Sequence, residues 1–145
     1  MKNTLYTKFG VHIKVQNIRS SLKYYTALQF NPVFAYGDKK FLKHFNTIPT
    51  APEKYNGIVF DIGNSTLEIA DGHLAVKPEV FKKTITNSKI SAMIQVTSLS
   101  NIEKLCKKNK IEITVPRRKF PWGTTELVLK DPDGLVLVFI ENLHN

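Results

Sequence analysis

Hydrophobic and polar residues alternate along two short segments that lie about eighty positions apart in the chain. The apolar positions are Val11, Ile13 and Val15 in the first segment and Ala92, Ile94 and Val96 in the second. An alternation of period two is typical of a strand that is buried on one face only. The pattern therefore predicts two equivalent β-strands, one near the start of each half of the chain.

An amphipathic helix is predicted directly after each of these strands. Asn17 is a candidate N-cap for the first helix, and Ser98 or Ser100 is one for the second. Apolar residues then recur every three or four positions, at Ile18, Leu22, Tyr25 and Leu28 in the first helix and at Ile102, Leu105 and Cys106 in the second. Asn109 is expected to end the second helix in the left-handed conformation. Cys106, on the apolar face, is expected to be buried and inert.

Three further strands are predicted after each helix, so that each half has the order β-α-β-β-β. They are residues 32–36, 57–62 and 66–70 in the first half and residues 111–115, 125–129 and 135–140 in the second. The first module covers about residues 8–72, a connector covers 73–89, and the second module covers about 90–142. The stretch between residues 36 and 56 is long for a connection, and the sequence leaves its role open.

The last two predicted strands flank the sequence Asp-Pro-Asp-Gly at residues 131–134, which suits a type I turn. Pro-Trp-Gly at residues 121–123 precedes this hairpin. With the duplicated βαβββ unit, these motifs make the chain resemble the glyoxalase, bleomycin resistance and extradiol dioxygenase superfamily, also called the vicinal oxygen chelate superfamily. The resemblance covers nearly the whole chain. It implies an α+β fold in one domain, residues 1–145, in which two modules form a cupped, barrel-like mixed sheet with helices outside.

The resemblance also indicates where metal ligands would lie. Metal-dependent members place His or Glu side chains at four strand positions, which correspond to Gly10, Glu68, Ser91 and Val138. Only Glu68 provides a ligand side chain, and His12, on the same strand face as Gly10, would add at most a second one. Because zinc sites generally use three or more protein ligands, we predict a protein without metal or other cofactor.

Six side chains are predicted to contact a small-molecule ligand instead. They are His12, Glu68, Ser91, Met93, Arg118 and Trp122. Glu68 is alternatively half of a buried pair with His12 or Lys14. In metal-free relatives a similar Trp stacks on planar ligand rings, whereas a structural plug at the strand start is the alternative for Trp122. Arg118, with Arg117, either clamps an anionic group or is simply solvated.

Composition limits the remaining possibilities. The chain has 145 residues with 42% hydrophobic and 23% charged residues, as in an ordinary globular protein. The single cysteine excludes an internal disulfide, no apolar run is long enough to span a bilayer, and a cytoplasmic location is expected. The formal net charge is +9, but the lysines are scattered and no nucleic-acid-binding motif is present.

These observations predict a metal-free, small-molecule-binding protein that sequesters its ligand without chemistry. Because the chain is strongly basic, a neutral or anionic ligand is favoured, and an aromatic one is expected. The predicted partners exclude specific nucleic acid and membranes, and a homodimer is possible. A metal-dependent glyoxalase-like lyase or ring-cleaving dioxygenase is the first alternative. A non-enzymatic interaction module with a basic surface is the second.

Overall fold

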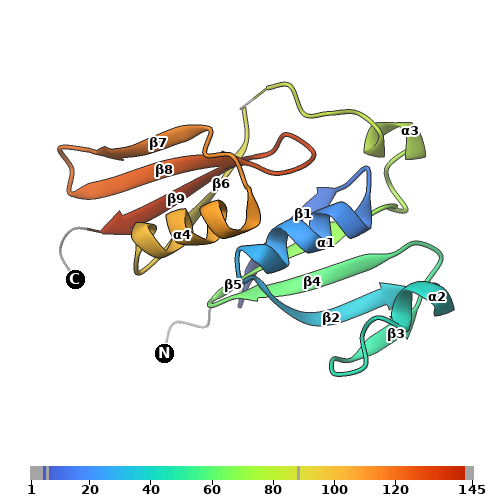
Figure 1. The fold of residues 1–145 in the computed structure, drawn as a ribbon. Helices are drawn as coiled ribbons and strands as arrows, with labels where there is room; N and C mark the ends of the chain where they lie inside the picture. The colour runs from blue at the N-terminus through green and yellow to red at the C-terminus, as the bar shows by residue number, and fades with distance from the viewer. Residues whose placement is uncertain (1–4, 6, 88, 143–145) are drawn as a thin grey trace. The chain divides into compact units, whose positions relative to one another are not determined.

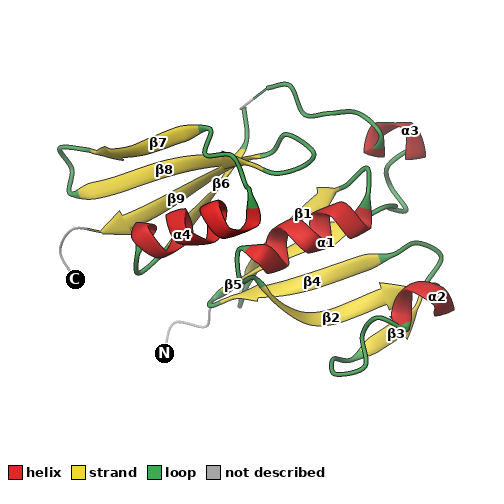
Figure 2. Ribbon diagram, in the orientation of Figure 1, coloured by secondary structure: helices red, strands yellow, loops and turns green. Residues whose placement is uncertain are grey.

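The computed structural model describes residue 5, residues 7–87 and residues 89–142. The chain divides into two compact units, Met1–Lys83 and Thr84–Asn145, which we call unit 1 and unit 2 (Figure 1). The division falls inside the predicted connector. Each unit contains its own mixed β-sheet (Figure 2), which confirms the predicted α+β class with a βαβββ module in each half. Neither sheet closes into a barrel.

Unit 1 contains a five-stranded sheet in the order β1-β5-β4-β2-β3. Its strands are β1 (Phe9–Lys14), β2 (Asn31–Gly37), β3 (Thr50–Pro52), β4 (Gly57–Ile62) and β5 (Ser65–Ala70). β1 runs parallel to β5, and β3 parallel to β2, whereas β4 is antiparallel to both of its neighbours. The helices of this unit are α1 (Ile18–Ala27), α2 (Lys39–Leu42) and α3 (Pro78–Phe81).

Helix α1 begins as the sequence predicts. The side chain of Asn17 accepts hydrogen bonds from the backbone N–H groups of Arg19 and Ser20, both at 3.1 Å. The fully buried ring of Tyr25 lies 5.7 Å from that of Phe60 on β4, measured between centroids. The helix therefore covers one face of the sheet, and this packing forms the core of unit 1.

Unit 2 contains a four-stranded sheet in the order β6-β9-β8-β7, with helix α4 (Leu99–Asn109) against β8 and β9. Its strands are β6 (Ser91–Gln95), β7 (Val115–Lys119), β8 (Thr124–Lys130) and β9 (Val136–Asn142). The side chain of Ser98, one of the two candidate caps, accepts a hydrogen bond from the backbone N–H of Asn101. Cys106 is buried on the sheet side of α4, and burial raises the pKa of its thiol, as expected for an inert cysteine.

The turn between β8 and β9 forms as predicted. The carboxylate of Asp131 accepts hydrogen bonds from the backbone N–H groups of Asp133 and Leu135, at 2.9 and 2.8 Å. The backbone N–H of Gly134 donates to the carbonyl of Asp131 at 3.0 Å and closes the turn. Gly134 has a φ of +89°, a conformation that other residues rarely adopt.

Two details of the second module differ from the prediction. The strand expected at residues 111–115 lies later in the chain, at Val115–Lys119. The hairpin at residues 120–123 joins it directly to β8, so the residues just before the hairpin are the ones that pair. Lys110, not Asn109, takes the left-handed conformation after α4. The side-chain amide of Asn109 donates to the carbonyl of Leu105 at 2.9 Å and keeps this residue within the helix.

The long segment from residue 36 to residue 56 contains the short helix α2 and the edge strand β3. Phe41 of α2 is buried within unit 1 and packs against Phe45, with the ring centroids 5.1 Å apart. Within the parts of the chain that the structure describes, no helix is both long and apolar enough to cross a membrane.

Candidate functional site

The sheet of unit 1 has an open face opposite α1, and this face carries two of the predicted ligand-binding residues. Strand side chains alternate, so Ile13 and Leu67 point to the core while His12 and Glu68 point to the other face. His12 on β1 lies directly beside Glu68 on β5 in the parallel register. Both side chains are half-buried.

A hollow of about 470 Å³ lies on this open face. Its main lining residues are the aromatic and ionisable side chains of His12, Phe34, Tyr36, Tyr55, Glu68 and His73. Ala51, Pro52 and Glu53, from β3 and the residue after it, complete the lining. A hollow of this size suits a small molecule with one or two rings.

Tyr36 holds the carboxylate of Glu68. The two residues come from β2 and β5, and the Tyr36 hydroxyl donates a hydrogen bond of 2.7 Å to Oε1 of Glu68. Gly57 on β4 makes the contact possible, because a Cβ atom there would lie 2.0 Å from Cζ of the Tyr36 ring. Burial and then the bond to Glu68 raise the pKa of Tyr36 well above its usual range, so the hydroxyl keeps its proton. The bond comes from Tyr36, and not from His12 or Lys14, the partners that the sequence suggested for Glu68.

His12 has an unsatisfied nitrogen in the hollow. Its Nε2 atom is buried and has no hydrogen-bond partner among the described residues. Burial lowers the pKa of His12. The nearby charge of Glu68 raises this pKa in part, whereas Lys14 and His73 lower it further. The imidazole is therefore neutral near pH 7. A buried polar atom without a partner costs free energy unless a ligand or water satisfies it.

The lowered pKa of His12 predicts a pH-dependent stability. The unfolded chain binds a proton at His12 below pH about 6.5, whereas the folded chain resists it, so acidification favours unfolding. The free energy of unfolding should therefore fall between pH about 7 and pH about 5, and less steeply in His12→Gln. Urea unfolding of both proteins at several pH values measures this difference. Parallel curves would show that His12 titrates normally in the folded chain.

The donor set of the hollow does not fit a catalytic metal ion. A Cβ atom at Gly10, the first expected ligand position, would lie 2.4 Å from Oγ1 of Thr66, so Thr66 already occupies this space. Near His12 and Glu68, the Nδ1 atom of His73 accepts a hydrogen bond from the backbone N–H of Ala75 at 3.0 Å. Across the described residues, no group of three His, Cys, Asp or Glu side chains is arranged to hold a metal.

In unit 2, Ser91 and Met93 lie on the face of β6 that points away from the core. Both are exposed, and Met93 is 72% exposed. They lie beside Val136 and Val138 of β9, so the fourth expected metal position is an aliphatic side chain next to a methionine. This part of the sheet presents an apolar surface with one hydroxyl group.

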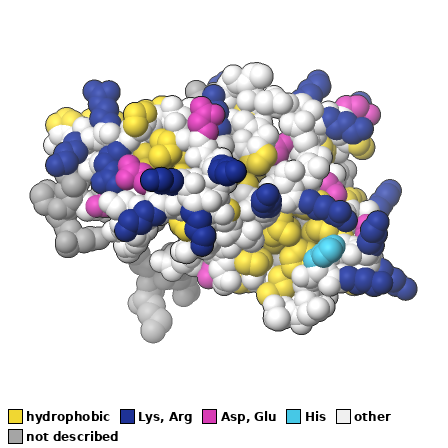
Figure 3. Space-filling view, viewed as in Figure 1, with side chains coloured by type: hydrophobic (Ala, Val, Ile, Leu, Met, Phe, Trp, Pro, Cys, Tyr) yellow, Lys and Arg dark blue, Asp and Glu magenta, His cyan; other side chains and the backbone are white. Residues whose placement is uncertain are grey.

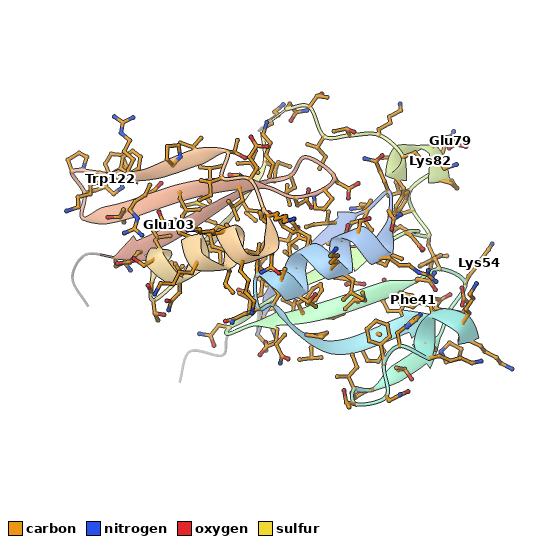
Figure 4. The ribbon with its side chains drawn as sticks, viewed as in Figure 1. Phe41, Lys54, Glu79, Lys82, Glu103 and Trp122 are labelled. Atoms are coloured by element: carbon orange, nitrogen blue, oxygen red, sulfur yellow. The ribbon has the colours of Figure 1, made fainter. Side chains whose placement is uncertain are left out.

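Trp122 lies in the hairpin between β7 and β8 (Figure 4), and Arg118 lies near the end of β7, two residues before Phe120. The Trp122 ring stacks on Phe120 with centroids 4.7 Å apart and an interplanar angle of 17°. The Arg118 guanidinium lies 5.4 Å from the Phe120 ring centroid, a cation–π contact. Arg117 instead forms an ion pair with Glu103 of α4 and donates to Oγ of Ser100, so it is not available as an anion clamp.

Trp122 is 67% exposed, which argues against the structural-plug alternative. We expect Trp122→Ala to change the free energy of unfolding by less than about 1 kcal/mol, because the side chain buries little surface. Chemical denaturation of the two proteins measures the change. A loss of about 3 kcal/mol or more, the usual cost of truncating a buried Trp, would restore the plug alternative.

The structure thus brings the predicted residues together in three pairs, and the hollow of unit 1 contains only His12 and Glu68. The other hollow-lining residues were not predicted. Phe34 and Tyr36 are two positions apart on a predicted strand, so the alternation of side chains in a strand puts both on the same face. His73 belongs to the connector, where the sequence has no periodic signal that would place it.

Two further hollows are present, and the one in unit 1 shares Tyr55 and His73 with this site. One of about 590 Å³ in unit 1 is more apolar, is formed largely by residues 71–78 and Phe81, and includes Lys54. One of about 330 Å³ in unit 2 has Val128 and Val136 in its lining, with Lys130 beside them. The smaller hollow of unit 1 is the better candidate, because it alone holds a buried polar nitrogen without a partner among the described residues.

Comparison with known proteins agrees with this architecture. A family model described as the Glyoxalase/Bleomycin resistance protein/Dioxygenase superfamily matches residues 10–139. No match was found among curated proteins.

Several of the solved structures similar to the chain carry names from this group. A bleomycin-binding protein in complex with bleomycin is 20% identical, with a TM-score of 0.57 over 96% of this chain and 99% of that one. A glyoxalase/bleomycin resistance protein/dioxygenase from Nocardioides is 10% identical, with a TM-score of 0.63 over 100% and 88%. A glyoxalase I mutant from Zea mays is 18% identical, with a TM-score of 0.67 over 92% and 44%. At these identities the likeness concerns the fold.

Proposed function

Because the chain belongs to the Glyoxalase/Bleomycin resistance protein/Dioxygenase superfamily, we propose that it binds a small aromatic molecule in the hollow of unit 1. The ligand is held by non-covalent contacts without a metal ion, so that the protein sequesters it. The observation that carries the proposal is the hollow itself, which is lined by aromatic rings and by His12, whose buried Nε2 atom has no partner among the described residues. Similar architecture in a bleomycin-binding protein supports a binding role.

The charge of the hollow differs from the charge of the whole chain. The net charge of +9 favours a neutral or anionic ligand, and Lys and Arg side chains are spread over the visible surface (Figure 3). The lining of the hollow, however, includes Glu53 and Glu68 and no Lys or Arg. Once a ligand is partly desolvated, nearby charges contribute more to its binding energy than distant charges, which are screened by salt. The proposed ligand is therefore aromatic and not anionic, which narrows the expectation from the sequence.

Metal analysis distinguishes sequestration from the enzymatic alternative. After incubation with Zn²⁺, Ni²⁺, Mn²⁺ or Fe²⁺ and gel filtration, we expect far less than one metal ion per chain, since no three ligand side chains among the described residues are arranged to hold one. Elemental analysis of the untagged protein measures the ratio. One retained ion per chain, lost in Glu68→Ala, would favour a lyase or dioxygenase instead.

A ligand screen tests the binding proposal directly. Planar aromatic compounds that bind only the folded chain should raise the midpoint of thermal unfolding. Phe34→Ala removes a ring from the hollow and should abolish the increase. Phe9→Ala is the matched control, because Phe9 is 75% exposed and does not line the hollow. An increase that survives Phe34→Ala would place the ligand elsewhere. A homodimer remains a prediction, which sedimentation equilibrium can test.

A further inference from the structure

The polar groups of the hollow in unit 1 point to a particular class of ligand. We propose that the ligand is a planar aromatic compound with an amidine-like N–H donor edge, and that the Glu68 carboxylate accepts hydrogen bonds from this edge. The inference rests on the proposed function, since it concerns the same hollow. Two observations support it: the hydrogen bonds that Glu68, Tyr36 and His12 make or lack, and the charged residues that line the hollow.

Glu68 has one oxygen occupied and one available. Oε1 accepts the hydrogen bond from Tyr36, and among the described residues no donor reaches Oε2. A half-buried carboxylate with a free oxygen gains most from a donor on the ligand, and a charged acceptor makes such a bond stronger than a neutral one. Tyr36 also fixes the carboxylate in one orientation before the ligand arrives, which reduces the entropy lost on binding.

The charges around Glu68 favour a donor that is cationic or strongly polarised. The carboxylate of Glu53 lies in the same lining, at the exposed rim beside β3. The ammonium group of Lys14 lies 3.5 Å from the backbone carbonyl oxygen of His12, and Lys14 is not among the residues of the lining. An anionic ligand would meet two carboxylates here, whereas a protonated amidine would form a charge-assisted bond with Glu68.

Three aromatic rings suit the flat body of such a ligand. Phe34 and Tyr36 have ring centroids 6.3 Å apart, and Tyr36 and Tyr55 have theirs 6.4 Å apart and nearly perpendicular. Delocalised cations are attracted to aromatic faces, and planar rings pack against them. Neutral His12 adds no repulsion, and its buried Nε2 atom offers a second polar contact.

Three probes of nearly equal shape test the inference. Benzamidine presents N–H donors and a positive charge, benzamide is neutral with one donor group, and benzoate is anionic and only accepts. Each is titrated into ¹⁵N-labelled protein, and dissociation constants are taken from the backbone amide shifts of β1 and β5. We expect benzamidine to bind most tightly, and at least about tenfold more tightly than benzoate. In Glu68→Gln the advantage of benzamidine over benzamide should disappear, because the charged acceptor is lost.

The possible outcomes separate the two proposals. Benzoate binding at these strands as tightly as benzamidine would overturn the amidine class and leave the binding function standing. If Glu68→Gln weakened the binding of all three probes equally, Glu68 would have a structural role, and the inference would also be overturned. If no probe shifts these resonances at millimolar concentration, the hollow is not a ligand site and both proposals fail.

Discussion

Asp131→Ala is expected to lower the free energy of unfolding by about 3 kcal/mol. The Asp131 side chain is only 4% exposed, and its carboxylate satisfies the backbone N–H groups of Asp133 and Leu135. Alanine would leave both donors buried or force the turn to open, and each unsatisfied buried donor costs about 1–3 kcal/mol. Urea unfolding of the wild-type and variant proteins gives the difference.

Asp131→Asn is the matched control for this prediction. The amide oxygen of asparagine can accept the same two hydrogen bonds, so most of the stability should be retained. If the free energy of unfolding falls as much in the asparagine variant as in the alanine variant, the negative charge stabilises the turn, and not the two accepted hydrogen bonds. A loss below about 0.5 kcal/mol in Asp131→Ala would show that the turn contributes little to the fold.

The same turn shows why so much of the fold could be predicted from the sequence. Turn and cap geometry depend on a few neighbouring residues, so Asp131 and Asn17 carry their structural role within the local sequence. The strand predicted at residues 57–62 is β4 (Gly57–Ile62) in the structure. The exceptions are also local, since Asn109 remains in the helix by bonding to its own preceding turn.

The candidate site was less predictable, because it depends on contacts between strands that are distant in sequence. Alternation placed His12 on the face of Gly10, and the family resemblance placed Glu68 at a ligand position, but neither gave a reason to connect Tyr36 with Glu68, which is 32 residues away. The bond requires β2 and β5 to lie on either side of β4, and it requires a position on β4 without a side chain. The sequence alone shows neither the strand order nor the space above Gly57.

Gly57→Ala is expected to weaken binding of benzamidine at least about tenfold without changing any residue that lines the hollow. The new methyl group would lie 2.0 to 2.6 Å from atoms of the Tyr36 ring, which must move away. Moving the ring breaks the hydrogen bond between the Tyr36 hydroxyl and Glu68, so the carboxylate loses its fixed orientation. Overpacking of this kind also costs about 1–3 kcal/mol in the free energy of unfolding. The amide titration and urea unfolding measure the two effects.

Gly63→Ala and Tyr36→Phe separate the effect on binding from the effect on stability. Gly63 has a φ of +61° and open space around it, so alanine there should cost about 1–2 kcal/mol of stability through backbone strain and leave binding intact. Tyr36→Phe removes the hydrogen bond without a clash and should reproduce the loss of binding. If Gly57→Ala binds benzamidine normally, then the orientation of Glu68 by Tyr36 does not determine affinity. In that case the ligand class depends on the Glu68 carboxylate and the rings of the hollow alone.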